Sequence, residues 1–179
     1  VIIDPRRTET AGLMGEHHFI RPDTDVFLLA ALLHVIIGEE LYEAATVRRH
    51  TRGFEELRAF VAAFPPARAG EVTGMAPEVI TALARDFARV RRACVYASVG
   101  VNMGSFGTLA VWLVHCLNLV TGRFDRQGSL LFPEGLIDMA RAMQKAGMPQ
   151  HTARIGGFPS VMGTLPAGFS TVKTLHCMG

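Results

Sequence analysis

The sequence begins with VIIDPRRTET (1–10), in which a short apolar run is followed at once by polar residues. Residues 1–4 are typical of a buried strand that ends at Asp4, because an Asp-Pro pair stops a strand and starts a turn. Arg6, Arg7 and Thr8 place guanidinium and hydroxyl groups directly beyond it. The stretch therefore predicts a strand with a polar cluster at its carboxyl end. Because it opens in mid-strand, it also predicts that further sequence precedes it.

Helical patterns dominate the chain between this strand and residue 122. Segment 25–38 is apolar on nearly every face, which predicts a helix buried on several sides. Asp23 or Thr24 is expected to cap it, with Asp25 in its first turn. Further helices are predicted over 53–64, from Pro77 to about residue 89 and over 108–120, with a short helical piece within 39–50.

A second strand is predicted at ACVYA (93–97), and it runs into the glycine-spaced loop SVGVNMGSFGT (98–108). The order strand, helices, strand, loop, helix predicts a helix-rich α/β fold with a mainly parallel sheet. Two strands are too few for a stable sheet, so we expect the others to come from outside this segment. Residues 134–179 are predicted to be rich in coil, with one further helix over 134–147.

Composition excludes several classes of protein. Of the 179 residues 49% are hydrophobic and the net charge is +2, which indicates a globular chain rather than a nucleic-acid-binding or membrane-surface protein. The apolar stretches 26–37 and 106–122 are interrupted by polar residues and are better explained as core helices than as membrane spans. The cysteines lie too far apart to predict a zinc or iron–sulfur site: Cys94, Cys116 and Cys177.

If the two predicted strands are parallel neighbours, segments 4–8 and 98–102 share the sheet edge at which open α/β folds bind ligands. Asp4 and Asp25 could then accept hydrogen bonds from a nucleobase, and the arginines and Thr8 could bind phosphate. The amides of residues 99–107 precede a helix N-terminus suited to a diphosphate. Together these groups resemble half of a nucleotide site, although no GxGxxG motif indicates an ordinary NAD site.

Three longer stretches resemble the molybdopterin oxidoreductases of the dimethyl-sulfoxide-reductase superfamily, which includes formate dehydrogenases and nitrate reductases. The family pattern V-x-D-P-R-x-T-x-T-A is similar to VIIDPRRTETA (1–11), and R-P-G-T-D … H-V-I is similar to segment 17–42. Segment 95–132 resembles Y-G-x-x-G-V … F-G-T … L-T-G-N-x-D-R-x-G-G. The likeness covers roughly residues 1–133, with the motifs in the family's order.

The resemblance implies that residues 1–133 are the central part of a Rossmann-like domain, incomplete here, that holds one of two molybdopterin guanine dinucleotides. Residues 134–179 would lead towards the next part of the enzyme. The positions that match the family's cofactor-binding segments are Asp4, Pro5, Arg6, Arg7, Thr8, Asp23, Thr24, Asp25, Val99, Gly100, Met103, Gly107 and Thr108.

The chain departs from the family pattern at several positions. Met103-Gly104 stands where relatives often carry a glutamine, and Asp23 replaces the glycine of P-G-T-D. Arg123, Gln127 and Ser129 stand where Asn, Pro and Gly are common. The resemblance places the ligand to molybdenum or tungsten, and the cysteines of a [4Fe-4S] iron–sulfur cluster, outside this segment, so no residue here is predicted to be catalytic.

The leading hypothesis is a fragment of a molybdenum or tungsten oxidoreductase catalytic subunit, carrying bis(molybdopterin guanine dinucleotide) and acting by two-electron or oxygen-atom transfer on a small substrate. Its expected partners are the rest of that subunit and electron-transfer subunits, with no nucleic acid and no membrane span. Two alternatives remain at this point: a non-catalytic structural or assembly module of the same fold, and a nucleotide-binding regulatory domain. The sequence does not distinguish a cytoplasmic from a periplasmic location.

Overall fold

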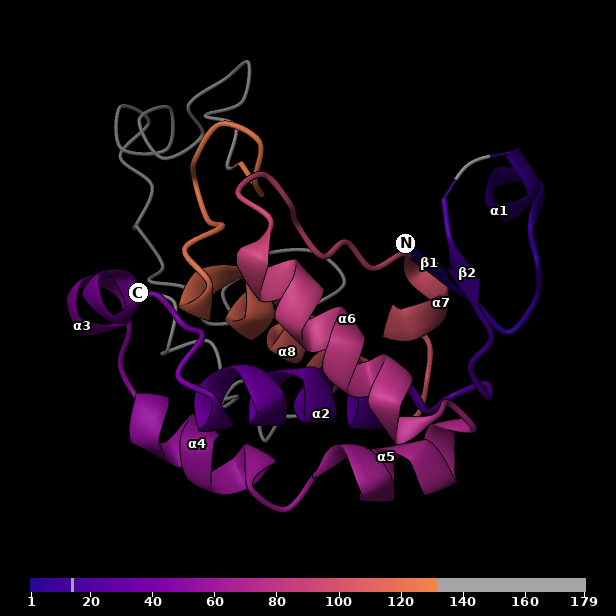
Figure 1. Cartoon of the computed structure of the whole chain (residues 1–179), viewed down its shortest axis with the longest axis horizontal. Helices are drawn as coiled ribbons and strands as arrows, with labels where there is room; N and C mark the ends of the chain where they lie inside the picture. Colours follow the sequence, from indigo (N-terminus) through magenta and orange to yellow (C-terminus); the bar gives the residue numbers. More distant parts are fainter. Residues whose placement is uncertain (14, 132–179) are drawn as a thin grey trace, which may run out of the picture. The chain divides into compact units, whose positions relative to one another are not determined.

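The computed structural model describes residues 1–13 and 15–131, which form the first of two compact units in the chain (Figure 1). The helix predicted over 134–147 and the coil beyond it lie outside the described residues, as does Cys177. The elements in chain order are β1 (Ile2–Ile3), α1 (Glu9–Leu13), β2 (His17–His18), α2 (Asp25–Gly38), α3 (Ala44–His50), α4 (Phe54–Val61), α5 (Pro66–Thr73), α6 (Pro77–Arg89), α7 (Val99–Asn102) and α8 (Gly107–Val120).

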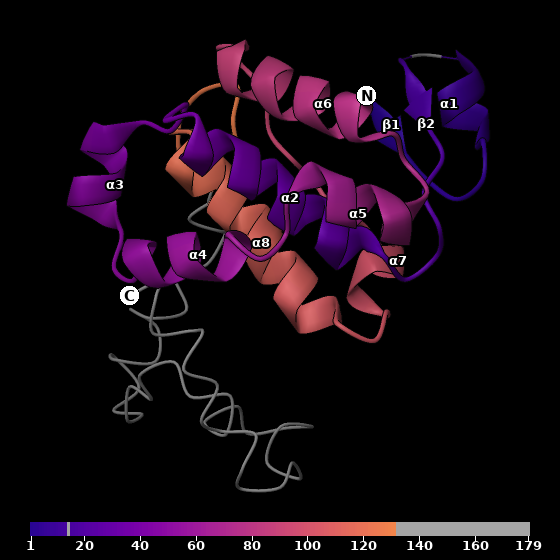
Figure 2. The same ribbon diagram turned by 60° about the horizontal axis from the view of Figure 1, so that its bottom comes forward.

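Helix α2 lies at the centre of the described unit and packs against α5, α6 and α8 (Figures 1 and 2). Its sequence DVFLLAALLHVIIG is apolar on all sides, and Leu33 and Ile36 are fully buried. A helix that is hydrophobic all round must be covered all round. The prediction of a helix over 25–38, buried on several sides, is therefore confirmed.

The other helices predicted among the described residues are also present, and three further helices, α1, α5 and α7, were not predicted. Helix α6 has Pro77 in its first turn, and α8 begins one residue earlier than predicted, at Gly107. Pro65 and Pro66 were expected only to end the helix over 53–64, but Pro66 lies in the first turn of α5, which continues to Thr73. Proline is tolerated there because the first N–H groups of a helix have no intrahelical partner. None of the described helices is long and apolar enough to cross a lipid bilayer.

The sheet differs from the prediction. Strand β1 is present, but its parallel partner is β2, with Ile2 opposite His17 and Ile3 opposite His18. Within the described residues this is a two-stranded sheet. The segment 93–97, predicted as the second strand, forms no regular element and pairs with no strand in the described part of the chain. The expectation that segments 4–8 and 98–102 end two paired strands is wrong.

A buried asparagine explains why segment 93–97 is not paired. The Asn118 side chain, fully buried on α8, donates to the Val95 carbonyl at 2.9 Å and accepts from the Val95 N–H at 2.9 Å. It therefore takes both backbone groups that a neighbouring strand would use at this residue. Its amide also donates to the Val114 carbonyl one turn earlier, at 2.9 Å.

Candidate cofactor site

Although the predicted strands do not pair, the structure still brings most of the predicted segments together. The carboxylates of Asp4 at the end of β1, and of Asp23 and Asp25 at the start of α2, are close enough to interact electrostatically. Asp23 in turn contacts the loop between α7 and α8 through Ser105. Three segments separated by up to about a hundred residues thus contribute to one edge of the molecule, as the site prediction requires.

The polar cluster beyond β1 is organised by two local hydrogen bonds. The Asp4 carboxylate accepts from the Arg6 N–H at 2.7 Å, and the Thr8 hydroxyl oxygen accepts from the Ala11 N–H at 3.2 Å at the start of α1. Carboxylates and hydroxyls commonly fix turns and helix starts in this way. Pro5, Arg6 and Arg7 are exposed, and neither guanidinium has a hydrogen-bond partner among the described residues. Both are therefore available to an anionic ligand.

Asp23 links the start of α2 to the α7–α8 loop. Its carboxylate accepts from the Ser105 N–H at 2.8 Å and from the Ser105 hydroxyl at 2.5 Å. These hydrogen bonds lower the pKa of Asp23, because they stabilise its ionised form. Gly104 makes the contact possible, since a Cβ at this position would lie 2.4 Å from an Asp23 carboxylate oxygen.

Thr24 is the N-cap residue of α2, which was one of the two predicted alternatives, but neither Asp23 nor Thr24 caps the helix through its side chain. Thr24 occupies the position before the helix, but its side chain makes no cap and instead donates to the Arg21 carbonyl at 2.6 Å. Asp23 is committed to Ser105, and its φ of 62° lies in the left-handed region that glycine adopts most easily. The residue that replaces the family's glycine thus keeps a glycine-like backbone and adds a carboxylate.

Asp25 is the half-buried acid of the site. Burial raises the pKa of its carboxyl, and the neighbouring carboxylates of Asp23 and Asp4 raise it further, against the opposing effect of its own backbone N–H. No other described residue donates a hydrogen bond to this carboxylate. Partial desolvation of a carboxylate whose one donor is its own backbone N–H is costly unless a ligand supplies further donors. The carboxylate is therefore suited to accept hydrogen bonds from a bound group.

This electrostatic arrangement predicts a pH dependence. A carboxyl whose folded-state pKa lies above its unfolded value binds more protons when folded, so stability is lost as the pH rises above about 3.8 and through the raised pKa. At pH 7 and without cofactor, Asp25→Asn should therefore raise Tm by about 1–2 °C, a small gain because the group is half exposed.

Thermal unfolding between pH 4 and pH 7 would measure this effect. The advantage of Asp25→Asn should shrink as the pH approaches 4, whereas Asp86→Asn, at an exposed position on α6, should leave Tm unchanged throughout. A lower Tm for Asp25→Asn at pH 7 would contradict this prediction, because it would show that interactions within the protein already stabilise the ionised carboxylate.

The glycine-spaced loop presents apolar side chains and one open glycine. Val99, Met103 and Phe106 are exposed, as is Tyr96 just before the loop. Gly100 has no atom within 4 Å of the place where a Cβ would stand, so another molecule can approach its backbone closely. Exposed apolar groups gathered around an open backbone are typical of a surface that another body covers.

Gly107 has a different role in the same loop. It is buried, and a Cβ there would lie 2.0 Å from the Asn102 carbonyl oxygen. Glycine is thus needed for the close packing of α7 against the start of α8. Thr108, the next residue, is exposed.

Ser105 and Gly104 were not among the predicted site residues. The sequence signal for both residues was the aspartate at position 23, where the family pattern has glycine. A carboxylate at this position needs a hydrogen-bond donor and space for its side chain. Among the described residues, no group of three or more His, Cys, Asp or Glu side chains could hold a metal ion. The arrangement offers hydrogen-bond acceptors, free guanidinium groups and an open backbone.

Comparisons with known proteins identify the class to which this arrangement belongs. No protein-family model matches the chain. The F420-dependent formate dehydrogenase subunit alpha of Methanocaldococcus jannaschii is 32% identical over 133 residues, which cover 74% of this chain and 20% of the relative. Formate dehydrogenase H of Escherichia coli is 32% identical over 126 residues, which cover 70% of this chain and 18% of that protein. A nitrate reductase and the molybdopterin-containing subunit of a thiosulfate reductase also match at 32% identity.

A solved structure supports the same assignment. Acetylene hydratase from Pelobacter acetylenicus aligns with a TM-score of 0.64 and 31% identity, covering 67% of this chain and 16% of the hydratase. The chain is therefore homologous to a segment of the molybdopterin oxidoreductases of the dimethyl-sulfoxide-reductase superfamily, as its motifs predicted. It spans about a fifth of the length of the curated relatives that it matches.

Proposed function

We propose that the chain forms one wall of a molybdopterin guanine dinucleotide site in the catalytic subunit of a molybdenum or tungsten oxidoreductase. The observation that carries this proposal is the half-buried Asp25 carboxylate, which lacks a donor from any other described residue. The amino and imino groups of a guanine are donors that would satisfy it. Homology to molybdopterin enzymes supplies the class of ligand.

The residues present fit this group in chemistry and in exposure. Asp25 and Asp4 would accept hydrogen bonds from the base, and the exposed Arg6 and Arg7 would pair with phosphate oxygens. Thr8 keeps its hydroxyl proton for a phosphate, because its oxygen is the atom that accepts from Ala11. Around this centre the proposal also includes Pro5, Thr24, Val99, Gly100, Met103, Gly107 and Thr108.

Asp23 would act by positioning the loop rather than by binding the cofactor. Both hydrogen bonds that its carboxylate accepts come from Ser105, so it holds the α7–α8 loop against the start of α2. The loop in turn presents the open backbone at Gly100 and the exposed side chains of Val99 and Met103. A loop fixed before the ligand arrives loses less conformational entropy on binding.

The whole enzyme is proposed to act on a small substrate. When bound, the cofactor would supply two-electron or oxygen-atom transfer, and this chain would orient it and shield part of it from water. The metal's ligand, a [4Fe-4S] iron–sulfur cluster and electron-transfer partners would be contributed from outside residues 1–133. We further propose that β1 and β2 belong to a larger Rossmann-like sheet, and that residues 134–179 lead towards the next part of the enzyme.

The direct test is to analyse the purified full-length protein for metal and, after acid release, for GMP. Molybdenum or tungsten together with GMP is expected. In the same protein Asp25→Ala should lower cofactor content at least fivefold, because it removes the acceptor, whereas Asp86→Ala on the exposed face of α6 should not change it. A wild-type protein that contains neither metal nor GMP would refute the proposed function, and unchanged content in Asp25→Ala would remove Asp25 from the site.

A further inference from the structure

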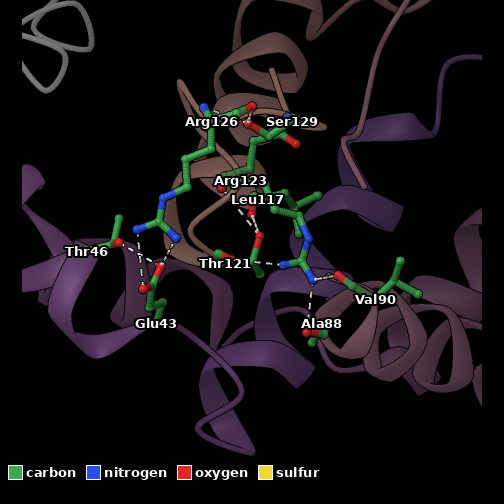
Figure 3. Close-up of polar contacts among 10 residues, drawn as sticks. Glu43, Thr46, Ala88, Val90, Leu117, Thr121, Arg123, Arg126 and Ser129 are labelled. Carbon is green, nitrogen blue, oxygen red and sulfur yellow. Dashed lines mark hydrogen bonds and ion pairs between the residues drawn. The ribbon is translucent and has the colours of Figure 1, made fainter. Parts of the chain in front are cut away.

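A polar cavity lies where the carboxyl ends of α2, α6 and α8 converge. It has a volume of about 390 Å³ and is lined by residues just beyond these helices and by the turn near Arg126 (Figure 3). The predicted cofactor wall lies at the opposite ends of α2 and α8. Since each of these helices has 14 residues, the two places are separated by about 20 Å of helix. The cavity is therefore distinct from the proposed cofactor site.

The Arg123 side chain lines this cavity and is held in place by several contacts. Its guanidinium donates to the Thr121 and Ala88 carbonyls, each at 3.0 Å, and to the Val90 carbonyl, as Figure 3 shows. It also lies over the Phe87 ring, with its central carbon 4.7 Å from the ring centroid. The side chain thus satisfies exposed carbonyls at the ends of two helices, and its position is fixed before any ligand arrives.

The remaining charges of the lining are poorly balanced. Four arginines and one glutamate line the cavity, which leaves three positive charges in excess. Arg126 is 3.4 Å from the Glu43 carboxylate, which also accepts from Thr46 at 2.7 Å. Arg89 and Arg91 are exposed, and neither guanidinium makes a hydrogen bond or a salt bridge among the described residues. Arg89 does interact electrostatically with Glu39, but the Glu39 carboxylate is already paired with Arg85.

This distribution favours an anion. A concave surface lined by one sign of charge concentrates the electrostatic field and raises the local concentration of counter-ions. Guanidinium groups bind phosphate and carboxylate oxygens through paired hydrogen bonds, and Arg89 and Arg91 have all their donors free. A volume of this size lies within the range of small-molecule sites.

We propose that this cavity binds a small polyanion carrying two or more phosphate or carboxylate groups. Arg89 and Arg91 contact the ligand directly. Arg126 gives up part of its ion pair with Glu43 in order to bind the ligand. Arg123 does not bind the ligand but keeps the lining of the cavity in a fixed position. This proposal does not depend on the identity of the cofactor at the other end of α2 and α8.

The test is calorimetric titration of the purified full-length protein at low salt with sodium pyrophosphate and, in parallel, with citrate. We expect at least one of them to bind with a Kd of about 10–100 μM. The double variant Arg89→Ala/Arg91→Ala should weaken this binding at least tenfold. Arg48→Ala/Arg49→Ala is the matched control, because it removes two exposed arginines from the last turn of α3 and should change the Kd less than twofold.

The two probes also separate the two ligand chemistries. Tighter binding of pyrophosphate assigns a phosphate-bearing ligand, and tighter binding of citrate assigns a polycarboxylate. If neither pyrophosphate nor citrate binds at 5 mM, the proposal is overturned. Equal loss of affinity in the two double variants would also overturn it, because the effect would then reflect net charge and not the cavity. Circular dichroism of the variants should match the parent, since neither pair is buried.

Discussion

Replacing Gly107 with alanine should lower the free energy of unfolding by about 3 kcal/mol, near the upper end for an overpacked site. The added Cβ would stand 2.0 Å from the Asn102 carbonyl oxygen, well inside van der Waals contact. The obstructing atom belongs to the backbone of α7 and cannot rotate away as a side chain could. Relief therefore requires α7 to move from the start of α8, and urea unfolding followed by circular dichroism would measure the cost.

Gly100→Ala is the matched control in the same loop. Gly100 lies in α7 and is exposed, with no atom within 4 Å of an added Cβ. Alanine is preferred to glycine in a helix by about 0.5–1 kcal/mol, so this variant should be as stable as the parent or slightly more stable. If Gly107→Ala proved equally stable, α7 and α8 would not pack as described.

The same two variants distinguish a packing glycine from a ligand-facing one. If the cofactor approaches the backbone at Gly100, as proposed, Gly100→Ala should lose cofactor while keeping its stability. Gly107→Ala should lose both, because the loop that it disturbs carries Gly100 and Ser105. Cofactor content and unfolding free energy, measured on the same preparations, separate these outcomes.

The helices could be predicted from the sequence because their signals are local. The all-apolar run 25–38 has only one stable environment, the interior, and Pro77 marks where α6 begins. Helix α5 was missed because paired prolines were taken to mark an end, whereas Pro66 is the first residue of a new helix. Local chemistry at a proline does not by itself distinguish these two possibilities.

The sheet could not be predicted, because strand pairing depends on partners far apart in the chain. An apolar extended run such as 93–97 has the composition of a strand, but Asn118 occupies the backbone groups of Val95. Conversely, His17 and His18 have no strand-like composition, and they pair with β1 because the chain returns beside it after α1. Burial of an asparagine cannot be foreseen from an apolar helix pattern.

The proximity of some candidate site residues could be predicted because these residues are chemically distinctive, while their binding of a cofactor stays a prediction. Asp4 and Asp25 do approach each other, and Arg6 and Arg7 are free, although the pairing of strands used to argue their proximity was wrong. Ser105 was missed since a single serine in a glycine-rich loop has no pattern of its own. The Asp23 replacement signals that a donor is needed, but that Ser105 is the donor follows only from the structure.

Asn118→Leu should lower the free energy of unfolding by about 3 kcal/mol. The leucine has a similar size but cannot pair with the Val95 N–H or its carbonyl, and each polar group left without a partner costs about 1–3 kcal/mol. The parent side chain is fully buried, so water cannot easily replace it. Asn102→Leu, at an exposed position on α7, is the control and should change stability by less than about 0.5 kcal/mol.

Hydrogen exchange of the Val95 amide would test the structural reason separately from the stability. In the parent this amide is bonded to the Asn118 side chain at 2.9 Å and should be protected. In Asn118→Leu it should exchange at least tenfold faster than the amides within α2, which keep their helical partners. A Val95 amide that stays protected in the variant would mean that segment 93–97 is paired with another strand in the full-length protein. Segment 93–97 would then be a strand of the larger sheet, held in place by hydrogen bonds to a neighbouring strand and not by Asn118.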